Sequence, residues 1–191
     1  MTLVSTDRIA AGALILTQLQ AEVGSLYTKR DLDLESWRRW EQKSALFKTR
    51  AAEFYAPFDA AAAALRAGDP TGLETAVQFL EADPWCFRSG YMKAGLMHRI
   101  ANSAGTEAHR PRLQDIVMYL LRHPQPRLLP PTVRLAAAVW DDNLQNRVIS
   151  LAEEDSSAAE QPQVFTRLVA HQIRTIRGLG HERWSRVDLQ A

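Results

Sequence analysis

Apolar residues recur at intervals of three and four along most of the chain, the spacing of one face of an α-helix. The first run, from Ile9 to Val23, predicts an opening helix over residues 5–26. The second spans about six turns and is largely aromatic. Its members are Trp37, Trp40, Ser44, Phe47, Ala51, Phe54 and Phe58. We expect this aromatic stripe to pack in the core, with a partner groove or a nucleic-acid platform as the alternatives. Pro57 is expected to kink or end the helix.

Residues 69–102 form the stretch around which the chain is organised, and they predict two helices folded back near Asp83 and Pro84. The first of these helices has one apolar stripe, made of Leu73, Ala76, Val77 and Leu80. Asp83 is expected to cap the second helix, with Pro84 in its first turn. Two glycines inside that helix, Gly90 and Gly95, each cost about 1 kcal/mol relative to alanine. They predict that another backbone approaches closely there, at the centre of the core.

Further apolar runs of helical period follow, in residues 113–121, 133–151 and 165–176. A proline-rich connector covers residues 123–131, and a break is expected at Asp141 to Asn143. No stretch shows the period-2 alternation that a sheet needs. The sequence therefore predicts an all-α fold of about 7–9 helices, as antiparallel helical hairpins stacked in a short HEAT-like superhelix or as an irregular helical bundle.

The length of 191 residues suits one well-buried domain. We expect a single all-α domain over residues 1–191. Its parts are the N-terminal helices 5–66, the central helical hairpin 69–104, the C-terminal helices 109–177 and the tail 181–191. Between the last two helices, residues 153–163 are polar, and the tail is expected to fray.

Successive helix pairs begin near residues 69 and 109, a spacing of roughly 40 residues that is typical of HEAT and armadillo units. Over about residues 69–177 the chain resembles HEAT- and armadillo-like α-helical repeat proteins, and the run FLEADPWCFRSGY resembles stretches of uncharacterised bacterial proteins. The resemblance implies stacked hairpins that expose one long face to a partner. Arginine greatly outnumbers lysine and alanine is abundant, which is typical of a GC-rich bacterial coding sequence.

The charge balance excludes any overall attraction to nucleic acid or to an anionic membrane, since 23 basic residues face 22 acidic ones. The apolar run from Ile9 to Leu16 is too short to span a bilayer, and no clear cleavage site follows it. We therefore expect a cytoplasmic protein without a membrane contact. The single cysteine, Cys86, excludes an intramolecular disulfide and a cysteine-based zinc site.

The search for chemistry yields no catalytic residue, metal ligand or cofactor-binding residue. None of the five histidines pairs with another at helical spacing, and the chain has neither a phosphate-binding loop nor a nucleophile motif. Cys86 is predicted near a helix N-terminus, where the dipole lowers a thiol pKa. Its neighbours Trp85 and Phe87 instead predict burial as a packed apolar residue.

Two polar clusters are candidate partner or ligand contacts. The first comprises Arg88, Ser89, Tyr91 and Lys93, polar groups within an otherwise apolar helix. If Arg88 points inward, it must be paired, with Glu81 or Asp83 as the nearest acid. An inter-helical ion pair and a ligand site are both open for this cluster.

The second cluster is the arginine-rich segment 109–134, in which Asp115 is the acidic residue that offsets the arginines. Its candidate contacts are Arg110, Arg112, Arg127 and Arg134. A basic stripe on the last predicted helix adds Arg167, His171, Arg174 and Arg177. These groups either form a scattered solvated surface or merge into one patch for a phosphate backbone or an acidic protein.

Taken together, these patterns favour a non-enzymatic protein-interaction module whose partner is another protein. The alternative is a nucleic-acid-binding helical protein that uses the 109–134 segment. A second alternative is a small-ligand binder or enzyme with a pocket near Cys86, Arg88 and Tyr91. The sequence leaves the oligomeric state open.

Overall fold

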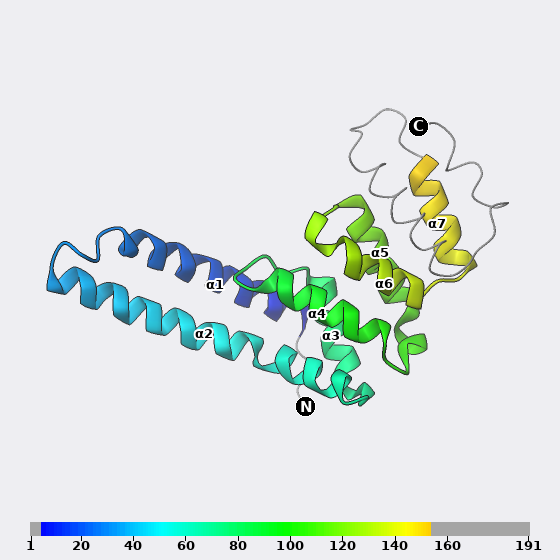
Figure 1. Cartoon of the computed structure of the whole chain (residues 1–191), viewed down its shortest axis with the longest axis horizontal. Helices are drawn as coiled ribbons and strands as arrows, with labels where there is room; N and C mark the ends of the chain where they lie inside the picture. The colour runs from blue at the N-terminus through cyan, green and yellow to red at the C-terminus, as the bar shows by residue number, and fades with distance from the viewer. Residues whose placement is uncertain (1–4, 154–191) are drawn as a thin grey trace. The chain divides into compact units, whose positions relative to one another are not determined.

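A computed structural model describes residues 5–153, and over this range the chain is all-helical, without a strand (Figure 1). The all-α prediction is confirmed. Contacts between Cα atoms divide the chain into two compact units, Met1–Lys93 and Ala94–Ala191. The single domain and the HEAT-like stacking stay predictions. The predicted polar stretch 153–163 lies almost wholly outside the described residues, and the predicted helix 165–176 and the tail lie wholly outside them.

The first unit is built on two long antiparallel helices, α1 (Thr6–Tyr27) and α2 (Leu34–Arg66), which lie side by side in Figure 1. Local signals set their starts. The Ser5 hydroxyl accepts a hydrogen bond from the Arg8 N–H, and the Asp33 carboxylate accepts one from the Ser36 N–H at 2.7 Å. The helix α2 runs through Pro57 and ends nine residues later, so this proline does not terminate it.

The core of the first unit lies where the second half of α2 meets the start of α1 and the short helix α3 (Leu73–Ala82). Its largest fully buried side chains include Tyr55, Phe58 and Phe79. The predicted stripe on α2 is thus core only in part. Ala51 and Phe58 are buried, but Trp37 is 40% exposed. Between residues 17 and 50 no side chain is fully buried, because two helices alone enclose a side chain on too few sides.

The helix α1 is long and apolar enough to cross a membrane by length and composition, the one such helix among residues 5–153. This is weak support for a membrane span, since a signal sequence near the N-terminus or the core helix of a soluble protein has the same properties. The sequence expectation considered only the shorter run from Ile9 to Leu16.

Close backbone approaches occur at glycines other than the two predicted. A Cβ atom on Gly72, in the 3-10 helix η1 (Pro70–Gly72), would lie 2.5 Å from the carbonyl oxygen of Ala61 on α2. The prediction for Gly90 and Gly95 is wrong. A Cβ on Gly90 would meet nothing within 4 Å, and one on Gly95 would meet only the flexible guanidinium of Arg99. Gly90 lies on the exposed face of α4, where no neighbouring element packs against it.

Replacing Gly72 with alanine is expected to destabilise the protein by about 1–3 kcal/mol, because the new methyl group overlaps rigid backbone at Ala61. The backbone of Gly72 has φ −79°, which alanine adopts freely, so the effect isolates the steric overlap. Gly90→Ala is the matched control and is expected to be neutral or to stabilise by up to about 1 kcal/mol. Urea unfolding followed by circular dichroism measures both. A Gly72→Ala variant as stable as the wild type would contradict the close packing.

The second unit contains the end of α4 (Ser89–Ala101), then η2 (Thr106–His109), α5 (Arg110–Arg122), η3 (Pro126–Leu128), α6 (Leu129–Ala138) and α7 (Asp142–Glu153). The helix α5 packs against α6 and α7. The fully buried leucines of this core include Leu113, Leu121, Leu135 and Leu144. The predicted break at residues 141–143 is confirmed as the start of α7. Part of the connector 123–131 is helical, because Pro130 and Pro131 occupy the first turn of α6.

Candidate functional site

The link between α3 and α4, residues 83–88, is a non-helical loop and not the predicted tight turn. Asp83 ends α3 in a left-handed conformation with φ 40°, and Arg88 precedes α4 with φ 67°. The prediction that Asp83 caps the second helix with Pro84 in its first turn is therefore wrong. Left-handed residues other than glycine are uncommon, and such strained backbone is concentrated at functional sites. The 83–88 loop is accordingly the candidate site.

Side chains from α1 and α2 hold this loop in place. The Thr17 hydroxyl donates a hydrogen bond to the carbonyl oxygen of Trp85 at 3.1 Å. The Tyr55 hydroxyl donates to the carbonyl oxygen of Phe87. A helix that began at Pro84 would use both carbonyl oxygens for its own bonds. These tertiary hydrogen bonds explain why α4 begins only at Ser89.

A buried ion pair closes the base of the loop. The Lys93 ammonium donates to the Asp83 carboxylate, and the two side chains are 3% and 14% exposed. The predicted inter-helical ion pair thus exists, but Lys93 is its cation. Arg88 is exposed, with its guanidinium 5.2 Å from the centre of the Tyr55 ring. Because Arg88 is exposed, the condition under which it was expected to pair with an acid is not met, whereas Lys93 lies on the buried face of α4.

Three aromatic side chains at the loop and the adjoining turn of α4 are exposed to solvent. We call them the loop aromatics: Trp85 is 67% exposed, Phe87 42% and Tyr91 81%. The prediction that Cys86 is buried as a packed apolar residue is met only in part, since Cys86 is half-buried and its neighbours Trp85 and Phe87 are exposed. Phe87 makes one edge-to-face contact with Phe47 of α2, with the ring centres 5.3 Å apart.

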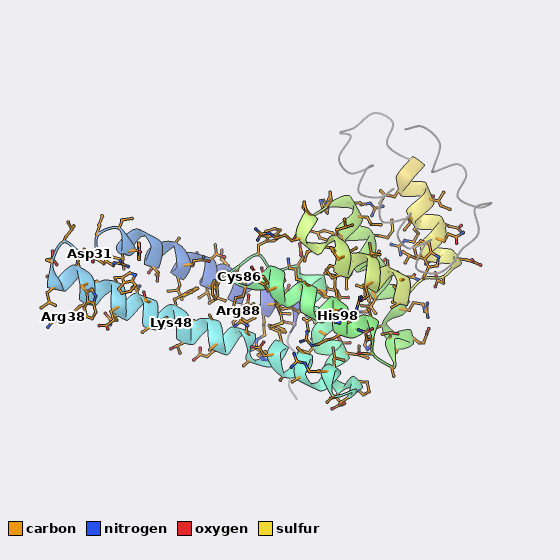
Figure 2. The ribbon with its side chains drawn as sticks, in the orientation of Figure 1. Asp31, Arg38, Lys48, Cys86, Arg88 and His98 are labelled. Atoms are coloured by element: carbon orange, nitrogen blue, oxygen red, sulfur yellow. The ribbon has the colours of Figure 1, made fainter. Side chains whose placement is uncertain are left out.

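Cys86 lies half-buried on the loop (Figure 2), and its sulfur is 3.3 Å from the Tyr55 hydroxyl oxygen. Burial raises the pKa of the Cys86 thiol, and the Tyr55 hydrogen bond and the Lys93 charge lower it by less. Burial also raises the pKa of Tyr55. Both groups are protonated at neutral pH, so this pair offers no activated nucleophile. Cys86 lies before the start of α4, outside the position where a helix dipole would favour its thiolate.

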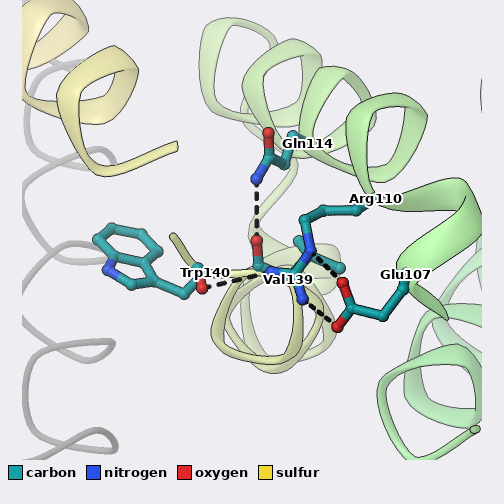
Figure 3. Close-up of polar contacts among 5 residues, drawn as sticks. All are labelled: Glu107, Arg110, Gln114, Val139 and Trp140. Carbon is teal, nitrogen blue, oxygen red and sulfur yellow. Dashed lines mark hydrogen bonds and ion pairs between the residues drawn. The ribbon is translucent and has the colours of Figure 1, made fainter. Parts of the chain in front are cut away.

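The arginine-rich segment belongs to the second unit, where Arg110 has a structural role. Its guanidinium donates two hydrogen bonds to the Glu107 carboxylate and a longer one, of 3.5 Å, to the carbonyl oxygen of Trp140 (Figure 3). Hydrogen bonds from Arg110 lower the pKa of Glu107. Beside it, the buried Gln114 amide donates to the carbonyl oxygen of Val139 at 3.0 Å. Together these donors hold the connection between α6 and α7 against α5.

The other arginines of the segment differ in their surroundings. Arg134 lies 2.9 Å from Nδ1 of His98, so it also has a partner within the unit. Arg112 is half-buried on α5, and Arg127 is exposed on η3. A single basic surface formed by these residues stays a prediction, and the stripe from Arg167 to Arg177 lies outside the described residues. Within the described part of the chain, no three His, Cys, Asp or Glu side chains form a group able to hold a metal ion.

Sequence reasoning missed three features of the site. It did not identify the buried role of Lys93, the exposure of Trp85 or the support from Thr17. The positive φ angles leave no signal in the sequence, since neither Asp83 nor Arg88 is a glycine. The chain matches no protein-family model, no curated protein and no solved structure. Its function must therefore be inferred from the geometry of its own residues.

Proposed function

We propose that this protein is a non-enzymatic, cytoplasmic protein-interaction module and that the loop aromatics contact its partner. The observation that carries the proposal is the exposure of Trp85, Phe87 and Tyr91 within seven consecutive residues. Fully burying a large apolar side chain contributes about 1.5–3 kcal/mol. Tryptophan and tyrosine are also enriched among the residues that dominate binding free energy at protein interfaces.

The rigidity of the loop supports a binding role. Its backbone is held by the hydrogen bonds from Thr17 and Tyr55, and its base by the Asp83–Lys93 ion pair. An anchor residue on a fixed backbone loses little conformational entropy when a partner covers it. The loop aromatics therefore combine exposed apolar area with a preorganised support, which suits a hot spot better than a loose surface loop does.

Charge indicates the chemistry of the partner surface. The exposed Arg88 guanidinium lies between Trp85 and Tyr91 in the chain. A partner that buries these aromatic rings and places a carboxylate near Arg88 satisfies both features. We favour this over nucleic-acid binding by Arg110, Arg112, Arg127 and Arg134. The guanidinium groups of Arg110 and Arg134 already have partners in the chain.

Site-specific photo-crosslinking in the native cell tests the proposal. Benzoylphenylalanine placed singly at Trp85 or Tyr91 is expected to give the same discrete protein adduct. The matched control is the exposed Asp59 on α2, which should not give that adduct. Replacing Trp85 and Tyr91 together with serine should then weaken binding of the captured partner by about 30-fold or more, a hot-spot effect. Tyr119→Ser, at a partly exposed tyrosine of the second unit, should leave the affinity unchanged. Equal labelling from all three crosslinker positions would refute the assignment.

A further inference from the structure

The outward face of α1 carries a stripe of residues with the spacing of a helix-packing seam. Arg8, Ala11, Ile15, Gln18 and Glu22 follow one another at intervals of three and four, and all five are exposed. We call them the α1 stripe. This spacing lets two helices pack side by side along a common seam. From Ile9 to Ala21 the helix has no charged residue, so a second helix can cover its middle turns without removing a charge from water.

The charges at the two ends of the stripe make it complementary to itself. Ile15 lies at the centre, with Arg8 seven positions before it and Glu22 seven positions after it. If a second copy of α1 packs antiparallel about a two-fold axis through Ile15, residue 8 of each copy faces residue 22 of the other. At each end of the helix pair, the Arg8 guanidinium of one copy then lies near the Glu22 carboxylate of the other. A parallel arrangement would instead oppose Arg8 to Arg8 and Glu22 to Glu22.

We propose that this protein forms a homodimer through antiparallel packing of α1, with Ile15 on the two-fold axis. A two-fold interface uses the same patch on both subunits, which requires the self-complementarity that this stripe has. The apolar centre comes from Ile15 and the neighbouring Leu14, which are 50% and 60% exposed.

The intramolecular contact of Glu22 is compatible with this dimer. One carboxylate oxygen of Glu22 accepts a hydrogen bond from the Lys43 ammonium at 2.6 Å, and the Glu22 side chain remains 51% exposed. A carboxylate has two acceptor oxygens, so the other can accept from Arg8 of the second copy. Lys43 thereby holds the Glu22 side chain on the surface where the second copy is expected.

The dimer interface does not overlap the loop aromatics. Thr17, which binds the Trp85 carbonyl, projects from α1 about 160° around the helix from Ile15 at the centre of the stripe, at 100° per residue. A dimer therefore leaves both copies of Trp85 accessible. Two linked copies of one binding site raise the apparent affinity for a partner that offers two epitopes. This inference does not depend on the proposed function, because self-association is measured on the purified chain alone.

Charge reversal tests the pairing of residues 8 and 22. Sedimentation velocity across a concentration series should show a species of about twice the 21.5 kDa chain mass. Arg8→Glu and Glu22→Arg should each weaken the dimer by about tenfold or more, because each creates two like-charge contacts by symmetry. The double reversal should restore the affinity to within a few fold. Arg38→Glu, an exposed charge near the start of α2, is the matched control and should have no effect (Figure 2).

Cysteine crosslinking tests the position of the axis. In a Cys86→Ser background, Ile15→Cys should form a disulfide-linked dimer on mild oxidation, because only a residue on the axis meets its own copy. Ala11→Cys should not, since its two copies would lie about 12 Å apart along the helices, beyond the roughly 7 Å that a disulfide spans.

Three outcomes would overturn the proposal. The first is a chain that stays monomeric at all concentrations. The second is a dimer whose affinity is unchanged by either single reversal or is not restored by the double one. The third is a monomer that binds phosphatidylcholine vesicles through α1, as shown by loss of binding in Ile15→Lys. That result would assign the outward face of α1 to a membrane surface.

Discussion

Phe79→Ala is expected to destabilise the protein by about 3–5 kcal/mol, because it removes a fully buried ring from the core of the first unit. The Phe79 ring is fully buried on α3 and contacts the rings of Phe54, Tyr55 and Phe58, at 4.4 Å between centres for Phe58. Truncation removes the transfer free energy of the ring and leaves a cavity among side chains that already pack on one another. Because a domain of this size is stable by only about 5–15 kcal/mol, such a loss is a large share of the total.

Urea unfolding monitored by circular dichroism measures this effect, with Tyr91→Ala as the matched control. Tyr91 is the most exposed of the aromatic residues described, and its truncation should change stability by no more than about 0.5 kcal/mol. The two variants also separate stability from binding, since Tyr91 is a proposed partner contact and Phe79 is not. A loss below about 1 kcal/mol for Phe79→Ala would show that α3 does not form the centre of this core.

The predictions from sequence succeeded where short-range signals decide the structure. The spacing of apolar residues and the capping side chains of Ser5 and Asp33 act within a few residues of each helix start. The spacing alone predicted α1 and the break before α7 closely, since neither cap was part of the prediction. Periodicity also shows which face of a helix is apolar, but it does not show how many neighbours that helix has.

Because periodicity does not show the number of neighbours, it did not predict the burial of Phe79 or the exposure of part of α4. The stripe predicted for the first helix of the central hairpin was Leu73, Ala76, Val77 and Leu80, and it did not include Phe79. In the structure α3 is surrounded on most sides, and Phe79 is buried beyond that stripe. The richer set of apolar residues after Asp83 predicted a heavily buried helix, yet Trp85 and Tyr91 of that set are exposed.

The 83–88 loop could not be predicted from local rules, because its supports are distant in sequence. Thr17 is 68 residues from Trp85, and Tyr55 is 32 residues from Phe87. Asp83 followed by Pro84 is a strong local signal for a helix start. The two tertiary hydrogen bonds and the ion pair to Lys93 override that signal. The same contacts create the strained, rigid loop that we propose as the binding site, so the prediction failed at the candidate site itself.

Removing one partner of the buried ion pair is expected to cost nearly as much as truncating Phe79. Lys93→Met should destabilise the protein by about 3–5 kcal/mol, because it takes away the ammonium that binds the largely buried Asp83 carboxylate. Asp83→Asn should have a similar effect by leaving the Lys93 charge without that carboxylate, while asparagine still tolerates the left-handed backbone. The double variant should lose less than the sum of the two, since neither remaining side chain is charged.

The exposed pair of Glu35 and Arg39 on α2 provides the control for this double-mutant cycle. Both side chains are mostly solvent-exposed, so Arg39→Ala should change the free energy of unfolding by no more than about 0.5 kcal/mol. If the effects of Lys93→Met and Asp83→Asn simply add, the two groups do not act as a pair, and the observed contact has no energetic role.

The ion-pair variants also connect stability to the proposed binding role. Asp83 and Lys93 are largely buried beside the loop aromatics, and the Lys93 ammonium lies 4.9 Å from the centre of the Trp85 ring. The double variant therefore changes the support of Trp85, including this contact, and leaves the ring itself in place. If rigidity of the loop contributes to affinity, the folded double variant should bind the captured partner more weakly than the wild type, with the loss appearing as faster dissociation. Unchanged affinity in a correctly folded double variant would show that the aromatic rings alone, without the strained backbone that presents them, account for binding.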